Sequence, residues 1–270
     1  MRRAGLLIAW TAFFTWTLAP IAWVFLTSIK PAAEAFRIPP SWSFEPTLAG
    51  YRAILSDSAV MHAFWNSVVI SIVSTLLVLI VALPAGYGYS RFRFGGRSLS
   101  AFVLLVARMF PPIVIVPGVF AFLRGTGLYD TRLVLVLLYA SFTVSLSTWM
   151  MKAFFDDVPL HIEEAAMVDG HTRLGAFLKV TLPIAAPGVV ATTIFTFILS
   201  WNEFLFAFMF TSDRAKTAPV EFVGIFLRES GVQWQLMSAG ACLMMLPTLG
   251  LSWMIHKYFI KGLGLGAVKG

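Results

Sequence analysis

The sequence predicts an all-α integral membrane protein with six transmembrane helices. The chain has 270 residues, of which 59% are hydrophobic and only 12% are charged, whereas an ordinary soluble domain has about 25% charged residues. A soluble domain of this length has too little interior to hide so much apolar surface. The apolar residues also form long runs, close to the ~20 residues that a helix needs to cross the hydrocarbon of a bilayer.

Six such runs are expected to span the membrane within a single domain, residues 1–270. The first carries no charge and is too long for the apolar region of a cleavable signal. The third contains Arg108 and Pro111–Pro112, which predict a kinked or broken helix. The fifth contains Glu203. In order, the expected spans are residues 5–29, 67–90, 98–123, 133–151, 189–210 and 236–256.

The charged connections orient these spans. Cytoplasmic loops are enriched in Lys and Arg, and short loops follow this rule best. Residues 91–97, Arg-Phe-Arg-Phe-Gly-Gly-Arg, carry three arginines and are therefore expected in the cytoplasm. Because six spans return the chain to its starting side, both termini are expected there too. The net charge of +7 is explained by such loops, so nucleic-acid binding is not expected.

A polar helical stretch, residues 156–187, separates the fourth and fifth spans and is expected to form a cytoplasmic two-helix module. Asp156–Asp157 stand just before Val158–Pro159. Proline is favoured at the first helical position, and a preceding Asp can cap the free amides, so the first helix is expected to begin there. Glu163–Glu164 follow early in this helix, where its dipole favours anions.

Gly170 is expected to end the first helix, because glycine tolerates the left-handed conformation of a helix C-terminus. Thr172 can then cap a second helix, which Pro183 is expected to end. One apolar face is predicted on this second helix at the spacing i, i+3, i+4, formed by Leu174, Phe177 and Leu178. On spacing alone, a surface hairpin without a partner is an equally good interpretation.

The module also carries a long motif: Glu164-Ala165-Ala166, three residues, Gly170, nine residues, and Val180-Thr181-Leu182-Pro183. This pattern resembles the EAA signature of ABC-importer permeases, in which isoleucine stands where this chain has Val180. Other stretches resemble the carbohydrate branch of that family, and specifically its smaller maltose-type membrane subunit: "NSVVISIVSTLL", "MFPPIVIVPGVF", "GLYDTRLVLVLLY", "WNEFLFAFMF" and "GLGLGAVKG".

The resemblance implies a function and a set of partners. Such a subunit translocates a sugar or sugar-like solute across the bacterial inner membrane by alternating access. It works with a second homologous permease subunit, two cytoplasmic ATPase subunits and an extracytoplasmic solute-binding protein, within membrane lipid. The resemblance implies that residues 211–235 receive the binding protein and that the tail, residues 257–270, reaches between the ATPase subunits. From the residues alone, a frayed terminus explains this tail as well. It assigns ATPase coupling to Glu164, Ala165, Ala166, Gly170, Leu182 and Pro183.

The chain itself is expected to carry no cofactor and no enzymatic activity. It has no G-x-x-x-x-G-K-[ST] phosphate loop and no Gly–Lys pair, so ATP and Mg²⁺ are expected on the partner ATPase subunits. No metal site is expected, because the four histidines lack Cys or carboxylate partners at metal-ligand spacing; they are His62, His161, His171 and His256.

Two spans contain polar groups that are candidates for the translocation path. Arg108 and Glu203 are charges inside apolar runs, and such charges usually face a partner or a cavity. Trp201 and Asn202 precede Glu203; an indole ring offers a sugar an apolar face, and the polar groups offer hydrogen bonds. Packing between helices explains the same residues, and the sequence leaves both interpretations open.

Two other classes of protein remain open from the residues alone. An ion-coupled secondary transporter usually carries several ionisable groups within its spans, and here only Arg108 and Glu203 qualify. An integral-membrane enzyme needs clustered catalytic carboxylates or histidines. The carboxylates around residues 156–169 are instead interpreted as helix caps and solvated helix faces. The identity of the sugar, polyol or sugar derivative is left open.

Overall fold

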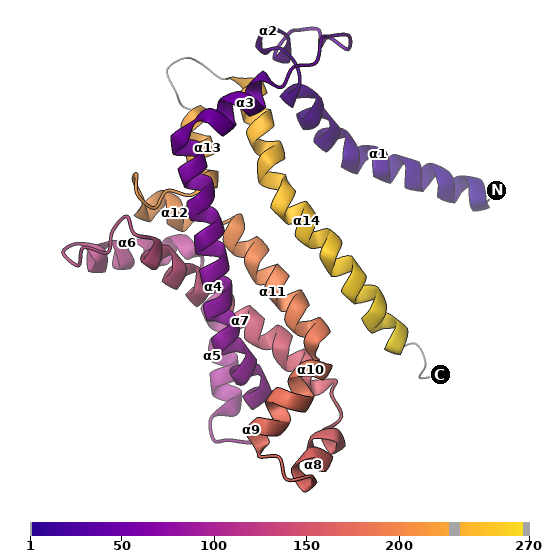
Figure 1. The fold of residues 1–270 in the computed structure, drawn as a ribbon, viewed down its shortest axis with the longest axis vertical. Coiled ribbons are helices and arrows are strands. Elements are labelled where there is room, and N and C mark those ends of the chain that lie inside the picture. The colour runs from indigo at the N-terminus through magenta and orange to yellow at the C-terminus, as the bar shows by residue number, and fades with distance from the viewer. Residues whose placement is uncertain (1, 227–232, 267–270) are drawn as a thin grey trace. The chain divides into compact units, whose positions relative to one another are not determined.

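The computed structural model describes residues 2–226 and 233–266, which form helices and their connections without a strand. Figure 1 shows their arrangement along the chain. The elements are α1 (Arg2–Ser28), α2 (Ala32–Ala35), α3 (Ala49–Ser56), α4 (Ser58–Arg91), α5 (Arg97–Met109), α6 (Pro112–Leu123), α7 (Arg132–Asp156), α8 (Leu160–Val168), α9 (Arg173–Ala176), the π-helical turn η1 (Phe177–Thr181), α10 (Leu182–Ile184), α11 (Ala186–Trp201), α12 (Leu205–Phe210), α13 (Ala218–Phe226) and α14 (Trp234–Gly266).

Among the described residues, four helices are long and apolar enough to cross a membrane, and up to six spans result if two bent helix pairs each count as one. The single helices cover residues 5–28, 58–91, 132–156 and 234–254. They correspond to the first, second, fourth and sixth expected runs, and the second is longer than expected because its helix begins at Ser58. The expected loop 211–235 is described only in part, since residues 227–232 lie outside the described residues, as do the last four residues of the tail.

The third expected span is broken, as its prolines predict. α5 ends at Met109 and α6 begins at Pro112, with a bend of 92° between them. Proline lacks the N–H that would continue the helix, and its ring clashes with the preceding turn. Phe110 and Pro111 are extended at this bend.

The fifth expected span, residues 189–210, is wrong as a single helix. α11 ends at Trp201 and a new helix, α12, begins at Leu205. The Glu203 carboxylate accepts hydrogen bonds from the backbone N–H groups of Phe206 and Ala207, at 2.9 and 3.3 Å. A carboxylate in this position satisfies the free donors of a helix start, so it stabilises a new helix where a continuous one was expected.

The chain divides into two compact units, and each has its own packing. The first comprises residues 1–65 and 218–248, with α1 to α3, α13 and parts of α4 and α14. Its core holds Ile54, Val60, Ile225 and Ala239. Gly240 is needed on α14, because a Cβ there would lie 2.1 Å from the ring of Phe222.

The second unit comprises residues 66–217 and 249–270, and small residues let its helices approach closely. On α4, a Cβ at Gly86 would lie 2.9 Å from the Met151 side chain of α7. On α11, a Cβ at Gly188 would lie 2.2 Å from the ring of Phe154, also on α7. The hydroxyls of Ser147 and Thr196 hydrogen-bond at 2.8 Å between α7 and α11. Small residues and hydroxyl pairs of this kind are typical of helix contacts within membranes.

Candidate functional site

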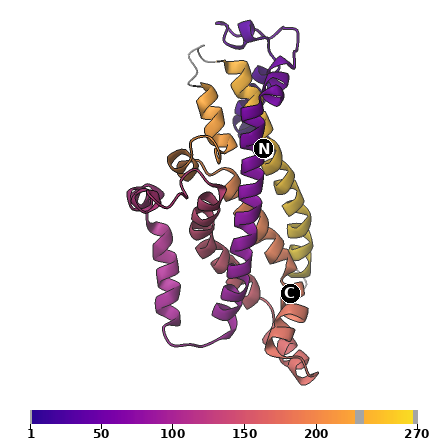
Figure 2. The ribbon, with the colours of Figure 1, turned by 60° about the vertical axis from the view of Figure 1, so that its left-hand side comes forward.

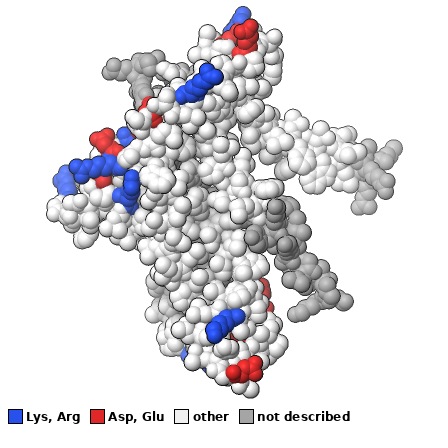
Figure 3. All heavy atoms as spheres, viewed as in Figure 1, with Lys and Arg blue, Asp and Glu red and all other residues white. Residues whose placement is uncertain are grey.

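The expected two-helix module is formed by α8, α9, η1 and α10. Figures 1 and 2 show it at the same end of the second unit as the turn between α4 and α5. Figure 3 shows charged side chains at this end and at the opposite end of the unit, with a nearly uncharged flank between them on the face in view. The module therefore lies at a polar end of an apolar helix bundle.

The start of the first helix differs from the prediction. Pro159 is the N-cap of α8 rather than its first residue, and no side chain caps the helix. Asp157 instead closes α7 as its C-cap. The Asp156 carboxylate accepts hydrogen bonds from Ser90 at 2.6 Å and Lys152 at 2.5 Å. The expected capping of α8 by these aspartates is wrong, because Asp156 is bonded to Ser90 and Lys152 and Asp157 belongs to the C-terminus of α7.

The turn between the two helices has the predicted geometry. Gly170 has φ = +91°, and the N–H groups of Gly170 and His171 donate to the carbonyls of Met167 and Ala166, both at 3.1 Å. This pairing is a Schellman C-cap, which requires a left-handed residue at the position of Gly170. The Thr172 hydroxyl accepts from Gly175 N–H at 3.1 Å, so the predicted cap of the second helix is confirmed.

The second helix does not end where Pro183 was expected to end it. It continues through η1 and α10 to Ile184, and the bend of 76° to α11 lies at Ala185. The N–H of Leu182 donates to the carbonyl of Phe177, five residues earlier. A proline ring clashes with the carbonyl four residues before it, and this wider turn displaces that carbonyl, so the helix passes the proline.

The expected apolar face of the second helix is divided between two environments. Phe177 is buried, whereas Leu174 and Leu178 are exposed by 65% and 51%. Two apolar side chains of α8, Leu160 and Val168, are exposed as well. The module therefore presents apolar side chains outward from both of its helices. An exposed apolar surface of this kind is typical of a site that contacts another molecule.

The residues of the motif do not share one surface. Glu164 and Ala165 are exposed on α8, whereas Ala166 is buried. At the far end of the motif, Leu182 packs against a buried apolar cluster and Pro183 is exposed. Glu164, Ala165, Gly170 and Pro183 are therefore accessible to a partner, whereas Ala166 and Leu182 pack inside the module and the bundle.

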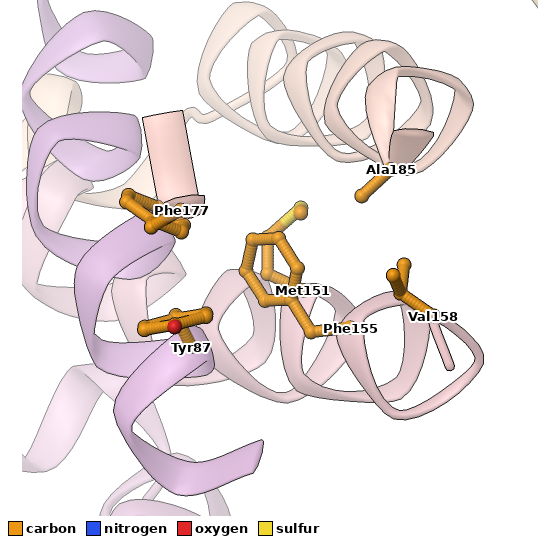
Figure 4. Close-up of a cluster of buried hydrophobic side chains, with 6 residues drawn as sticks. All are labelled: Tyr87, Met151, Phe155, Val158, Phe177 and Ala185. Atoms are coloured by element: carbon orange, nitrogen blue, oxygen red, sulfur yellow. The ribbon is translucent and has the colours of Figure 1, made fainter. Parts of the chain in front are cut away.

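Figure 4 shows that buried cluster, in which α4, α7 and the second helix of the module meet. Its members are Tyr87, Met151, Phe155, Val158, Phe177 and Ala185. The ring of Tyr87 lies 4.4 Å from that of Phe177, between centroids, and 5.9 Å from that of Phe155. Aromatic pairs at such distances add stability beyond the area that they bury.

Glu163, expected on a solvated helix face, is buried beside this cluster and only 3% exposed. Its Oε1 accepts from Arg91 Nε at 2.7 Å and its Oε2 from the Tyr87 hydroxyl at 3.0 Å. Neither Arg91 nor Tyr87 was predicted from the sequence as a partner of Glu163. Their spacing of four residues puts both on one face of α4, which is the signal that predicts a shared contact.

Arg108 and the helix that follows Glu203 both contact Phe142 of α7. Arg108, in the last turn of α5, donates to the carbonyl of Phe142 at 3.2 Å. The ring of Phe142 lies 5.0 Å from that of Phe206, in the helix that Glu203 caps. Arg108 also borders a cavity of about 440 Å³, whose lining includes Phe102, Phe110 and Ser145. The structure therefore brings the two broken helices to the same part of the bundle.

The candidates next to Glu203 are placed differently from one another. Trp201 is 1% exposed, and its ring stacks on that of Phe197 at 6.0 Å. Asn202 is exposed, and its Nδ2 donates to the carbonyl of Ile198 at 2.9 Å. In this structure the indole face is covered by protein, and the Asn202 amide is the more accessible group.

Asp130, at the end of the second unit opposite to the module, was also not predicted from the sequence as a structural residue. Asp130 accepts five hydrogen bonds, at 3.0–3.1 Å, from the backbone of residues 212–215 and the Ser212 hydroxyl. Burial alone raises the pKa of this carboxyl, but the backbone N–H donors outweigh burial and hold its pKa well below the usual range. Nearby, Asn66 donates to the carbonyls of Arg214 and Lys216 and accepts from Arg132. These contacts tie the connection after α6 to the one after α12.

No group of three or more His, Cys, Asp or Glu side chains suited to a metal ion occurs in the part of the chain that the structure describes. What the arrangement offers is a capped, partly apolar module at one end and two broken helices in the bundle.

Residues 74–259 match the model of a protein family described as binding-protein-dependent transport system inner membrane component. The chain is 35% identical over 269 residues to a probable ABC transporter permease protein, y4oR, of Sinorhizobium fredii, covering 97% of this chain and 95% of that protein. It is 34% identical to the trehalose transport system permease protein SugB of Mycobacterium tuberculosis, with 94% and 93% covered. It is 32% identical to the trehalose/maltose transport system permease protein MalG of Thermococcus litoralis, with 94% and 92% covered.

Solved structures share the fold. A chain of a bacterial ABC transporter involved in the import of the acidic polysaccharide alginate matches with a TM-score of 0.75 at 23% identity, covering 96% of this chain and 97% of that chain. A chain of the MetNI methionine ABC transporter, in an inward-facing conformation, matches with a TM-score of 0.59 at 19% identity, covering 74% and 94%.

Proposed function

The chain belongs to the family of binding-protein-dependent transport system inner membrane components, and we propose that it is a permease subunit of an ATP-driven importer for a sugar or sugar-like solute. Members of this family are transport subunits rather than enzymes. The trehalose and trehalose/maltose permeases named above are 34% and 32% identical to it, over 94% of this chain. Trehalose and maltose, which those relatives' names mention, are therefore the first cargoes to test.

The observation that carries this proposal is the two-helix module with its fixed turn and outward-facing apolar side chains. Glu164 and Ala165 are exposed on α8, and Gly170 is exposed in the turn between α8 and α9. These three residues form the exposed part of the module. We propose that this exposed part docks on an ATPase subunit together with Pro183, while Leu182 holds the module to the bundle. The ATPase subunits bind ATP and Mg²⁺ in this proposal, because this chain lacks a phosphate loop.

The arginine-rich turn supports a cytoplasmic position for the module. Residues 92–96 connect α4 to α5, and Arg91 contacts Glu163 of the module directly. Lys and Arg mark the cytoplasmic side of short loops, so both features are placed on that side of the bacterial inner membrane, with the two termini. The connections around Asp130 and residues 211–217 then face outward, where the solute-binding protein is proposed to dock.

The cargo path is proposed along the two broken helices. Backbone irregularity at membrane depth is tolerated where it is buried in protein or lines a water-filled cavity. Arg108 and Asn202 offer exposed polar groups near the breaks, while Glu203 and Trp201 shape the second break. A second, homologous permease subunit is proposed to complete the path and to bury part of the apolar surface that lipid does not cover.

The test is ATP-dependent uptake by the assembled importer in vesicles. The chain is co-expressed with a second permease subunit, an ATPase and a solute-binding protein of the same importer class, and uptake of labelled trehalose and maltose is measured. The expected result is co-purification of the ATPase, and uptake that requires hydrolysable ATP and the binding protein. Uptake driven by an ion gradient without ATP would instead support a secondary transporter, and product formation by the isolated chain would support an enzyme.

A further inference from the structure

Docking to an ATPase does not explain the buried contact between the end of α4 and the start of α8. Arg91 is the last residue of α4, and Glu163 lies in the first turn of α8, 72 positions later in the chain. Their side chains are 10% and 4% exposed. Charged side chains are almost never buried to this degree unless they are paired.

The pair is held in one orientation by further hydrogen bonds. Arg91 Nη2 donates to the carbonyl of Val158 at 2.7 Å and Nη1 to the Ser90 hydroxyl at 3.1 Å. On the other side, the Tyr87 hydroxyl donates to the second carboxylate oxygen of Glu163. A planar guanidinium with several fixed partners allows little rotation, which is why arginine suits such buried contacts.

The packing around the pair makes it part of a rigid corner. Tyr87 contributes its hydroxyl to Glu163 and its ring to the cluster with Phe155 and Phe177 (Figure 4). The ring of Phe92, just after α4, lies 6.0 Å from that of Tyr87 and 5.1 Å from the Arg173 guanidinium of the module. Both helices of the module are therefore attached to the same end of α4.

Chain connectivity alone does not provide this attachment. The module is continuous with α7 on one side and α11 on the other, so a displacement of the module is passed to those helices through the backbone. α4 lies earlier in the chain and is joined to the module through side chains. If its contacts with the module were loose, only its packing against α7, as at Gly86 and Met151, would carry α4 along when the module moved.

We propose that the Arg91–Glu163 ion pair is the joint that makes α4 move with the two-helix module, so that Arg91 and Glu163 are positioning residues for transport. This inference rests on the proposed function, because an ATPase must move the module. The pair does not bind the ATPase or the cargo: it transmits the displacement of the module to a third helix of the bundle.

The joint is tested by a distance measurement within the second unit of the assembled importer. Spin labels are placed at Ile80→Cys on α4 and His161→Cys on α8, both exposed, with Cys242→Ser removing the native cysteine. Pulsed EPR distances are compared without nucleotide and with Mg-ATP and vanadate. With the joint intact, the distance is expected to stay within ~2 Å, the scale of ordinary helix shifts. With Glu163→Gln, the distance is expected to shift beyond that on nucleotide binding, because Arg91 then lacks its ionic partner.

Lys152→Gln is the matched control. It removes a partly exposed ion pair with Asp156 at the same end of α7 and leaves Arg91–Glu163 intact, so it is expected to behave like the parent. If Glu163→Gln prevents assembly, Arg91→Lys replaces it, because lysine keeps the charge but cannot make the same set of bonds. The shift with nucleotide is then expected in Arg91→Lys.

The outcomes separate this inference from the proposed function. Loss of ATPase co-purification or of nucleotide trapping in the parent complex would contradict the proposed function. A parent that traps nucleotide while its Ile80–His161 distance changes by more than ~2 Å would overturn the joint alone. So would a Glu163→Gln or Arg91→Lys complex that assembles, traps nucleotide and keeps the parent distance in both states.

Discussion

Single carboxylates fix the positions of segments that are far apart in this chain. Asp130 has φ = +58°, a left-handed conformation that is uncommon outside glycine and in which Asp and Asn are enriched. Its backbone N–H donates to the carbonyl of Phe210 at 3.0 Å, while its carboxylate accepts five bonds from the following segment. One residue thus fastens the connection after α12 from both its backbone and its side chain.

Replacing Asp130 by asparagine is expected to destabilise the protein by about 2 kcal/mol, the order of the net value of hydrogen bonds to a charged group. Asparagine also tolerates positive φ, so the change isolates the carboxylate from the backbone. Thermal unfolding of the purified complex in detergent measures the effect. An unchanged unfolding temperature would show that the five bonds contribute no net stability.

The same carboxylate predicts a pH dependence. Its pKa in the folded state lies below the reference value of 3.8, so its contribution is fully present above that value and is lost as pH falls through the folded pKa. The difference in stability between the parent and Asp130→Asn is therefore expected to be constant from neutral pH to about pH 5, and to shrink below about pH 4. A difference that grows as pH falls would contradict the assigned direction of the pKa shift.

At the scale of helices, local signals in the sequence were sufficient for some features and not for others. Gly170 and Thr172 were predicted correctly because a left-handed C-cap and a hydroxyl N-cap each depend on the nearest few residues. The same reasoning placed Glu163 on a solvated face. Its burial depends on Arg91 and Tyr87, and no local rule indicates which distant helix a carboxylate will meet.

The positions of helix breaks were likewise predicted correctly in one case and missed in others. The pair Pro111–Pro112 predicted a break because proline acts on its own turn. Pro183 did not end its helix, since a π-turn formed before it, and such turns are rare enough to be a weak expectation. The second break, before Glu203, was missed because an apolar run that contains one Glu looks like a continuous span until that carboxylate is seen to cap a new helix.

The turn of the module gives a prediction at this scale. Gly170→Pro is expected to abolish coupling between ATP hydrolysis and uptake while leaving membrane insertion intact, because proline requires φ near −65° and lacks the N–H that bonds to Met167. Gly170→Asn is the matched control, since it keeps the N–H and tolerates the positive φ. Uptake and hydrolysis in reconstituted vesicles measure the effect. Parental uptake by Gly170→Pro would show that the turn is not needed to transmit force.

The close contact between α7 and α11 in the second unit gives another prediction. Gly188→Ala is expected to destabilise the protein by about 1–3 kcal/mol, the usual effect of overpacking, because the added Cβ would overlap the ring of Phe154 between α11 and α7. Gly118→Ala on α6 is the control, since a Cβ there meets nothing within 4 Å. Thermal unfolding of both variants measures the difference. Equal stability of the two would show that α7 and α11 can separate without cost.

At the scale of the whole molecule, apolar side chains are exposed along much of the described chain. α1 is the clearest case: Leu7, Ile8 and Trp16 are all more than half exposed, and the apolar window of this helix is not buried at all. A soluble monomer rarely exposes contiguous apolar surface of this extent. Lipid and the proposed second permease are the environments that would remove this surface from water.

Composition and the lengths of the apolar runs were enough to predict a lipid environment and an all-helical fold, because these two properties depend on sums over many residues. The division of the chain into two compact units had no such signal. It depends on which residues near position 65 and after position 218 pack together, as Ile54 and Val60 do with Ile225 and Ala239. Pairing between distant segments is decided by shape complementarity, which the order of residue types along the chain does not reveal.

The orientation of the second unit is the prediction that affects every functional assignment. Gly95 lies in the arginine-rich turn with open space around it, and Asp213 lies beside the Asp130 contacts with a side chain that is 92% exposed. Each cysteine is introduced into a Cys242→Ser background, and intact cells that express the variant are treated with a membrane-impermeant maleimide. The reagent is expected to label Asp213→Cys directly, and to label Gly95→Cys only after the membrane is permeabilised. This result is expected because short arginine-rich loops stay on the cytoplasmic side. The reverse labelling would place the arginine-rich turn outside the cell, and with it the module, which lies at the same end of the second unit. No cytoplasmic ATPase would then reach it, and ATP-driven transport through this module would be excluded.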